Sequence, residues 1–374
     1  ASDKDALMST PSGDSQHTLV TANSYADSPR TDWNGALIEE TSAFRSDIEL
    51  FYDLHTLFWD PSLGETLDVR NDATGSVSWT SSKIPELRLK NEFQFGDGTN
   101  ASLNQRVVAS VDRCGLLVHN EASFADNRER TIFTLSRLAI NEHSHDDPYA
   151  DHEATVYHKD DCDVIVATDG DRYVAFAQQR CENRRFDGHR VGLAGQRHGP
   201  NRSAWSDIYE ANDGWIDSTD SASGSVDLGF GLHCDPDTDT GGSEIEWLTA
   251  VGFGKKEQAA IDHARETLDA GYEAERTAFA EAWETWHADV TTAPTDDAAS
   301  ADLYQRSLTS IKVGQDGCCA TIAGAFKPHD MTYKFIWPRD QVIIVQALLA
   351  AGATDEAALA VNWLDGVQIT EETV

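Results

Sequence analysis

The stretch LTAVGFGKKEQAAIDHARETL, residues 248–268, divides the chain into two kinds of sequence. Before residue 254, apolar residues come in short or alternating runs, whereas after it they recur every three or four residues. From residue 255 to 290 this spacing predicts one long amphipathic helix, bent at Gly271. Its apolar positions are Ile261, Ala264, Leu268, Tyr272, Phe279, Trp283, Trp286 and Val290. We therefore expect a β-rich part followed by an all-helical part.

The first part of the chain, from about residue 17 to 255, is typical of many short strands. Its apolar runs are broken by Asp, Gly, Asn and Ser, the residues that favour turns. This pattern predicts a large antiparallel β structure, most simply a sandwich. The runs are residues 48–58, 77–79, 106–111, 116–118, 131–138, 164–167, 173–177, 225–232 and 245–253.

The last part of the chain predicts three shorter helices. The first begins after TTAPTDDAAS, with Ser300 as its expected N-cap and Leu303, Leu308 and Ile311 as its apolar face. The others are expected over residues 340–351, ended by Gly352, and over residues 355–364. Since three short helices cannot enclose a core, we expect an incomplete helical domain. The predicted domains are a β-sandwich over residues 1–254, a linker helix over 255–298 and an incomplete helical domain over 299–374.

Charge is the strongest feature of the composition. The chain has 64 acidic and 29 basic residues, a net charge of −35, and its basic residues are 20 Arg and only 9 Lys. Such a chain repels nucleic acid, which excludes that class of partner. Because salt screens self-repulsion, acid excess with few lysines favours a halophilic protein. An ordinary acidic secreted enzyme is the alternative.

Metal, redox and membrane roles find little support in the sequence. The six cysteines lack zinc-ligand spacing and are expected to be small buried residues. A group of His and Asp side chains could chelate a metal but is better read as a solvated loop; it comprises His143, His145, Asp146, Asp147, Asp151 and His152. No run of 18 apolar residues and no leader is visible, so we expect a soluble protein, with a cytoplasmic location favoured and no cofactor.

Four residues before the helix expected at 340 suit sugar binding: Tyr333, Trp337, Arg339 and Asp340. Trp337 offers a flat apolar face to a pyranose ring. Arg339 donates and Asp340 accepts, so together they can hold two adjacent hydroxyl groups. The alternative is structural, with Asp340 capping the helix, Pro338 stiffening the turn and Trp337 in a core.

The segment YKFIWPRD, residues 333–340, followed by an apolar helix and AAG, resembles the first sugar-contacting loop of glycoside hydrolase family 15. NDGWIDS at 212–218, LTAVGFG at 248–254 and the Trp-bearing helix resemble the N-terminal domain and linker of its prokaryotic members. The resemblance implies a multidomain chain with an N-terminal super-β-sandwich, a helical linker and the start of an (α/α)6 barrel. It also implies that the four site residues line the pocket for the terminal glucose of an α-glucan.

The same resemblance implies an exo-α-glucosidase of the glucoamylase type, which inverts configuration with two glutamates. Both would lie on later barrel helices, so we expect no catalytic residue within this chain and the missing barrel as its partner. Linkage specificity for starch, dextran or trehalose stays open. The alternatives are a non-catalytic carbohydrate-binding or scaffold protein built on the sandwich, and a sugar phosphorylase.

Overall fold

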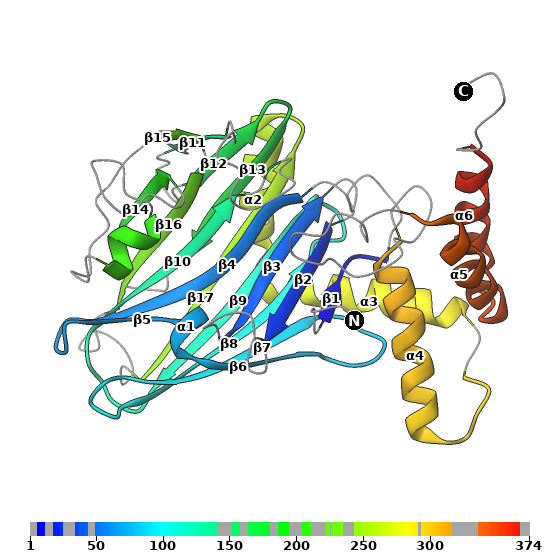
Figure 1. Cartoon of the computed structure of the whole chain (residues 1–374), viewed down its shortest axis with the longest axis horizontal. Coiled ribbons are helices and arrows are strands. Elements are labelled where there is room, and N and C mark those ends of the chain that lie inside the picture. Colours follow the sequence, from blue (N-terminus) through cyan, green and yellow to red (C-terminus); the bar gives the residue numbers. More distant parts are fainter. Residues whose placement is uncertain are drawn as a thin grey trace.

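The computed structural model shows two antiparallel sheets followed by helices (Figure 1). It describes residues 6–11, 18–24, 34–43, 49–138, 140, 152–157, 164–179, 186–193, 204–210, 221–224, 226–234, 243–290, 293–315 and 336–366. Each of the nine apolar runs in the sequence overlaps a strand. The expectation of an N-terminal antiparallel β-sandwich followed by helices is therefore confirmed.

The first sheet has the strand order β1-β2-β3-β4-β10-β16-β14, with β5 paired to β4. Its strands are β1 (Ala6–Met8), β2 (Thr18–Ser24), β3 (Ala36–Ala43), β4 (Glu49–Asp60), β5 (Glu65–Asp68), β10 (Arg130–Leu138), β14 (Phe186–Leu193) and β16 (Val226–Cys234). A one-turn helix, α1 (Val69–Asp72), follows β5, and a π-helical turn spans Ser206–Glu210.

The second sheet has the order β15-β11-β12-β13-β17-β9-β8-β7-β6. Its strands are β6 (Thr74–Trp79), β7 (Leu87–Gln94), β8 (Asn100–Ala109), β9 (Gly115–Phe124), β11 (His152–Tyr157), β12 (Val164–Asp169), β13 (Arg172–Gln179), β15 (Ser221–Gly224) and β17 (Glu244–Gly254). Residues alternate between buried and more exposed along β7, so one face of this strand points into the core and the other outward.

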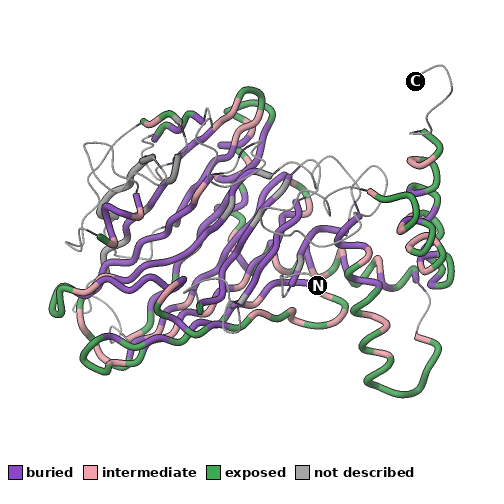
Figure 2. Tube along the Cα trace, viewed as in Figure 1, coloured by how far each residue is buried: buried purple, intermediate pink, exposed green. Residues whose placement is uncertain are grey.

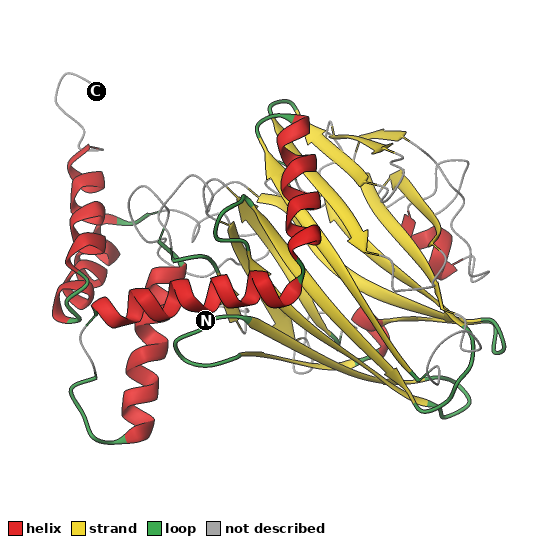
Figure 3. Cartoon of the chain, turned by 180° about the vertical axis from the view of Figure 1, so that it is seen from behind, coloured by secondary structure: helices red, strands yellow, loops and turns green. Residues whose placement is uncertain are grey.

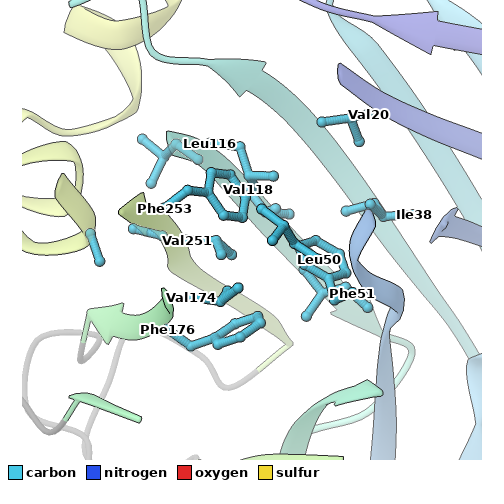
Figure 4. Packing of buried hydrophobic residues seen from close by; sticks show 14 of the residues in the cluster. Val20, Ile38, Leu50, Phe51, Leu116, Val118, Val174, Phe176, Val251 and Phe253 are labelled. Carbon is cyan, nitrogen blue, oxygen red and sulfur yellow. The ribbon is translucent and has the colours of Figure 1, made fainter. Parts of the chain in front are cut away.

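The core between the sheets is made of aliphatic and aromatic side chains (Figure 4). Phe51 of β4 meets Phe176 of β13 across the gap, with ring centroids 5.7 Å apart. A second cluster lies around Phe58, whose ring stacks on Phe93 at 5.0 Å. These contacts hold the two sheets face to face as a sandwich.

The helix expected over 255–290 is in fact two helices, α2 (Glu257–Ala270) and α3 (Tyr272–Asp289). Gly271 separates them with a φ of 77°, a conformation that glycine adopts without the steric penalty of a side chain. The helix α2 lies against the outer face of the second sheet, and α3 turns away along the sandwich (Figure 3). A Cβ on Gly252 would come within 2.3 Å of the α2 backbone, so this close approach needs glycine.

Three further helices extend from the sandwich: α4 (Ala298–Val313), α5 (Pro338–Ala350) and α6 (Thr354–Gly366). The N-cap of α4 is Asp297, whose carboxylate accepts from the Ser300 amide at 2.8 Å, so the expectation that Ser300 is the cap is wrong. Strands are buried along most of their length, whereas α5 and α6 have long exposed stretches (Figure 2). Within the described residues, no helix is long and apolar enough to cross a membrane.

Candidate functional site

The start of α5 carries three of the four residues predicted to bind sugar. Pro338 is the first residue of the helix, where its missing amide hydrogen costs nothing and its fixed φ suits the helix. Trp337 is the N-cap, and its carbonyl accepts from the Gln341 amide at 2.9 Å. This geometry places Arg339 and Asp340 in the first turn. Tyr333 lies outside the described residues.

All three described side chains at this helix start are accessible. Trp337 is 42% exposed, and the side chains of Arg339 and Asp340 are 87% and 33% exposed. The Arg339 Nε atom lies 3.4 Å from Asp340 Oδ1, an exposed contact that contributes little to stability. A cation and a carboxylate held this loosely both stay available to a ligand.

The structural alternative for this segment is wrong in two respects. Trp337 is not part of a core, since more than a third of its surface faces solvent. Asp340 does not cap α5, because the N-cap position is Trp337 and no side chain makes a capping hydrogen bond. The Asp340 carboxylate instead lies in the first turn, where the helix dipole favours a negative charge.

A buried polar cluster near the end of α5 joins α6 to α3 and α4. The Glu356 Oε1 atom accepts from Trp286 Nε1 at 2.7 Å and lies 3.2 Å from Lys312 Nζ. Burial lowers the pKa of Lys312. Burial alone raises the pKa of Glu356, but the Lys312 charge and the Trp286 hydrogen bond outweigh it and lower that pKa. Since α6 packs on α5, this cluster also holds the pair of helices against α3 and α4.

A second group of charged residues, which the sequence analysis did not identify, lies on the outer face of the first sheet. His55 Nδ1 is 3.4 Å from Asp53 Oδ1, and Arg70 pairs with Asp68 at 3.0 Å. Burial alone raises the pKa of Asp53, but the neighbouring His55 imidazole holds it well below its usual range. Trp205 covers the group and donates to Asp68 Oδ2 at 2.9 Å.

This covered group cannot reach a sugar directly, because its side chains, those of Asp53, His55, Asp68 and Arg70, are at most 6% exposed. Its internal ion pairs connect α1 to β4. The sequence signal for it is the spacing of Asp53 and His55, which are two residues apart and so share a face of β4. The partners on α1 become visible only in the folded structure.

The residues that the structure describes contain no group of three or more His, Cys, Asp or Glu arranged to hold a metal ion. His152 is buried in β11 with its Nε2 atom 3.1 Å from the Ile140 carbonyl, while the other members of the predicted solvated loop lie outside the described residues. Cys114 is buried and not in a disulfide, as expected for a small core residue.

The fold described above is that of an N-terminal domain of a glycosidase, a β-sandwich joined to helices. The chain belongs to the family described as Glucodextranase, domain N, whose model matches residues 35–288, more than half of the chain. A search of curated protein sequences finds no match.

Among solved structures, the chain is similar to a bacterial glucoamylase complexed with acarbose, with a TM-score of 0.76 and 18% identity. The likeness covers 98% of this chain and 50% of the other, so the chain spans about half the length of that enzyme. A GH92-family glycosyl hydrolase gives a TM-score of 0.43 at 11% identity, covering 84% of this chain and 38% of that one. A GH92 α-mannosidase from Bacteroides thetaiotaomicron gives 0.41 at 11% identity, covering 83% and 38%. Both GH92 scores are too low to indicate a shared fold.

Proposed function

We propose that this chain is the N-terminal portion of a glucoamylase-type exo-α-glucosidase, which removes terminal glucose from α-glucans with inversion. The observation that carries the proposal is the match of nearly the whole chain to the fold of a bacterial glucoamylase, within a family defined by glucodextranase. The accessible cation and carboxylate at the start of α5 add the chemistry of sugar recognition.

In this proposal, Tyr333, Trp337, Arg339 and Asp340 line the pocket for the non-reducing glucose. Trp337 packs on the C–H face of the ring, Arg339 donates to hydroxyl oxygens and Asp340 accepts from hydroxyl groups. The general acid and base are two glutamates outside residues 1–374, on opposite faces of the sugar. Residues 1–254 are the sandwich domain, 255–298 the linker and 299–374 the first part of the catalytic barrel.

The proposed partner of α5 and α6 is the rest of an (α/α)6 barrel. Val342, Ile343 and Leu349 on α5 are each more than half exposed, and Val361 on α6 is 49% exposed. Several exposed apolar side chains on two neighbouring helices are typical of a surface that contacts another part of a protein. Further barrel helices would cover it and close a pocket over the start of α5.

The test uses the longer protein that carries this sequence, assayed for glucose release from maltodextrin, isomaltodextrin and trehalose in high salt. Arg339→Ala and Asp340→Ala should each lower kcat/KM by about 100-fold or more, roughly 3 kcal/mol of transition-state stabilisation. Arg306→Ala and Asp302→Asn are matched controls, since this exposed pair, 3.8 Å apart, lies on α4 and not on α5.

Three outcomes would contradict the proposal. Sugar binding without glucose release would favour the non-catalytic alternative. Glucose release that depends on inorganic phosphate would favour a phosphorylase. Variants of Arg339 and Asp340 that lose stability but keep kcat/KM would show that these residues serve the helix and not the sugar.

We also propose that the protein is adapted to high salt, because a net charge of −35 makes the folded chain repel itself. Screening shortens from about 10 Å at 0.1 M salt to about 3 Å at 1 M, so the midpoint of thermal unfolding should rise strongly over this range. A midpoint that is the same at both salt concentrations would refute the adaptation. The cytoplasmic location stays a prediction.

A further inference from the structure

A small depression lies on the outer face of the second sheet, over β7, β8 and β9. Its volume is about 240 Å³, and its lining includes Arg88, Lys90, Asn104, Arg106 and Glu121. These five residues alternate with buried ones along their strands, so their side chains point away from the sandwich core. The depression is on a different part of the fold from the start of α5.

The charge of this depression is opposite to that of the chain. Arg88, Lys90 and Arg106 against Glu121 give 3 − 1 = +2, in a protein with a net charge of −35. Arg88 and Arg106 are direct partners across the β7–β8 pair. Like charges in that position destabilise an antiparallel pair, so a counter-charge is needed to offset the repulsion.

The carboxylates of the protein meet this need only in part. Arg88 is held by Thr80 through a 2.8 Å hydrogen bond, and its NH2 atom is 3.9 Å from Glu86. Glu86 is shared, because it also accepts from the Tyr272 hydroxyl and lies 3.3 Å from Arg276. One buried carboxylate therefore acts on three arginines, Arg88, Arg276 and Arg106.

Arg106 and Lys90 differ in their partners. Burial alone lowers the pKa of Arg106, but Glu121, the Tyr272 hydroxyl and Glu86 outweigh it and raise that pKa. Arg106 and Glu121 approach to 3.6 Å, but their side chains are 37% and 38% exposed, and exposed pairs of this kind contribute little. Lys90 is exposed and has no carboxylate within ion-pair distance in the part of the chain that the structure describes. The depression thus presents an excess of positive charge.

We propose that this depression binds an oxyanion, a phosphate, sulfate or carboxylate group that is free or carried by a sugar. Arg88 and Arg106 can each donate to such a group through N–H groups that their protein partners do not use, while Lys90 adds a point charge. A volume near 240 Å³ is below the range of about 300–1,000 Å³ for drug-sized ligands, yet well above the ~30 Å³ share of one water. It therefore fits a tetrahedral anion or a single anionic sugar.

Two neighbours extend the recognition beyond charge. Asn104 can donate to an anion oxygen or accept from a hydroxyl group, and the Glu121 carboxylate can only accept. A ligand that places hydroxyl groups beside its anionic group would satisfy both of these side chains. An anionic monosaccharide such as glucuronate or glucose 6-phosphate has this chemistry.

The test is calorimetric titration of this chain with sodium phosphate, sodium sulfate, glucuronate and glucose 6-phosphate, at an ionic strength held constant with NaCl. We expect saturable binding that Lys90→Gln and Arg106→Gln each weaken by about tenfold, the size of one lost charged hydrogen bond. Lys256→Gln, an exposed lysine of the same charge between β17 and α2, should bind like the wild type. Far-UV circular dichroism checks that the variants fold.

The ligands also distinguish the sources of the anion. Tighter binding of the two anionic sugars than of phosphate and sulfate would assign the site to a sugar, and equal binding would assign it to the free anion. The proposal would be overturned if the heats of titration equalled those of NaCl alone. It would also be overturned if the Lys90→Gln variant bound the anions as tightly as the wild type. A concentration-dependent dimer that Lys90→Gln abolishes would overturn it as well, because an acidic surface of a second copy would then be the occupant.

Discussion

The β-sandwich and the helices α5 and α6 differ in how completely they bury their own apolar residues. In the sandwich, Phe51, Phe58 and Phe176 have no exposed surface. In α5, by contrast, Ile343 is 66% exposed and Leu349 is 54% exposed. The sandwich therefore closes its own core, whereas the helix pair buries one side and leaves another without a covering surface in the described structure.

The difference follows from the pattern of apolar residues in each element. Along β7, apolar residues alternate with polar ones, so a single facing sheet buries the whole apolar face. In α5, the sequence VIIVQALLA is apolar on nearly all sides, and a helix of this type needs neighbours around it. Among the described residues, α6, the end of α3 and Tyr304, Leu308 and Ile311 of α4 share a cluster with Leu348 of α5.

The largest effect is expected in the closed core. Phe58→Ala should lower the free energy of unfolding by about 3–5 kcal/mol, because it removes a ring that contacts Phe93 and Phe124 and leaves a cavity. Denaturant unfolding followed by tryptophan fluorescence measures it. Phe58→Leu is the matched control and should cost less than half as much. A loss under about 1 kcal/mol for Phe58→Ala would mean that this part of the sandwich is loosely packed.

A smaller and more local effect is expected at the cluster that joins the helices. Glu356→Gln leaves the buried Lys312 charge without its partner, which should destabilise the helical part by about 2–3 kcal/mol. Hydrogen exchange should become faster in α6 while that of the sandwich strands stays the same. Asp302→Asn, which breaks the exposed pair with Arg306, should change neither. If hydrogen exchange became faster by the same factor in α6 and in the sandwich strands, the two parts would unfold as one unit.

His287 should make the contact between α3 and α4 sensitive to pH. Burial, with a smaller contribution from the Lys83 charge, lowers the pKa of His287 to about 4 from a usual value of 6.5. Between these two values the unfolded chain binds a proton that the folded chain does not, so stability falls as pH falls from 6.5 to 4. For this buried group, which is 7% exposed, the loss should be about 2–3 kcal/mol.

The measurement for His287 is the difference between the wild type and His287→Gln in unfolding free energy, followed over this pH range. The acidic residues are common to both chains, so their titration cancels. Lys83→Gln removes the neighbouring cation and should make the pH dependence of the wild-type histidine smaller. Parallel curves for the wild type and His287→Gln would contradict the assignment.

Much of the fold follows from the sequence, because the periods of two and of about 3.6 residues reflect which side of an element is buried. The break between α2 and α3 was expected only as a bend, since the apolar spacing continues across Gly271 and hides the positive φ. The cap of α4 was misplaced by three residues because Asp297 and Ser300 are both good caps, and only the bond between them shows which one acts.

The candidate sites show the same limit. Arg339 and Asp340 are adjacent in sequence, so their shared helix start could be predicted from a local motif. Arg88 and Arg106 are 18 residues apart and become neighbours only through the register of β7 and β8. The covered group around His55 likewise combines β4 with α1. A site can be predicted from the sequence when its residues are neighbours in the chain. A site whose residues come together only through strand pairing cannot.

The smallest effect in this chain is expected at the exposed face of α5. Ile343→Ser should change the free energy of unfolding by less than about 0.5 kcal/mol, because the side chain is already mostly in contact with water. In the longer protein the same change should cost about 2–4 kcal/mol if barrel helices cover this face, since burying an isoleucine side chain is worth that much. Leu348→Ser changes a residue with no exposed surface, so it should lower the free energy of unfolding strongly in both proteins. An equal, small effect of Ile343→Ser in the two proteins would mean that the apolar face of α5 stays exposed. The barrel would then not be the partner of α5, and the main support for a closed pocket at the start of this helix would be lost.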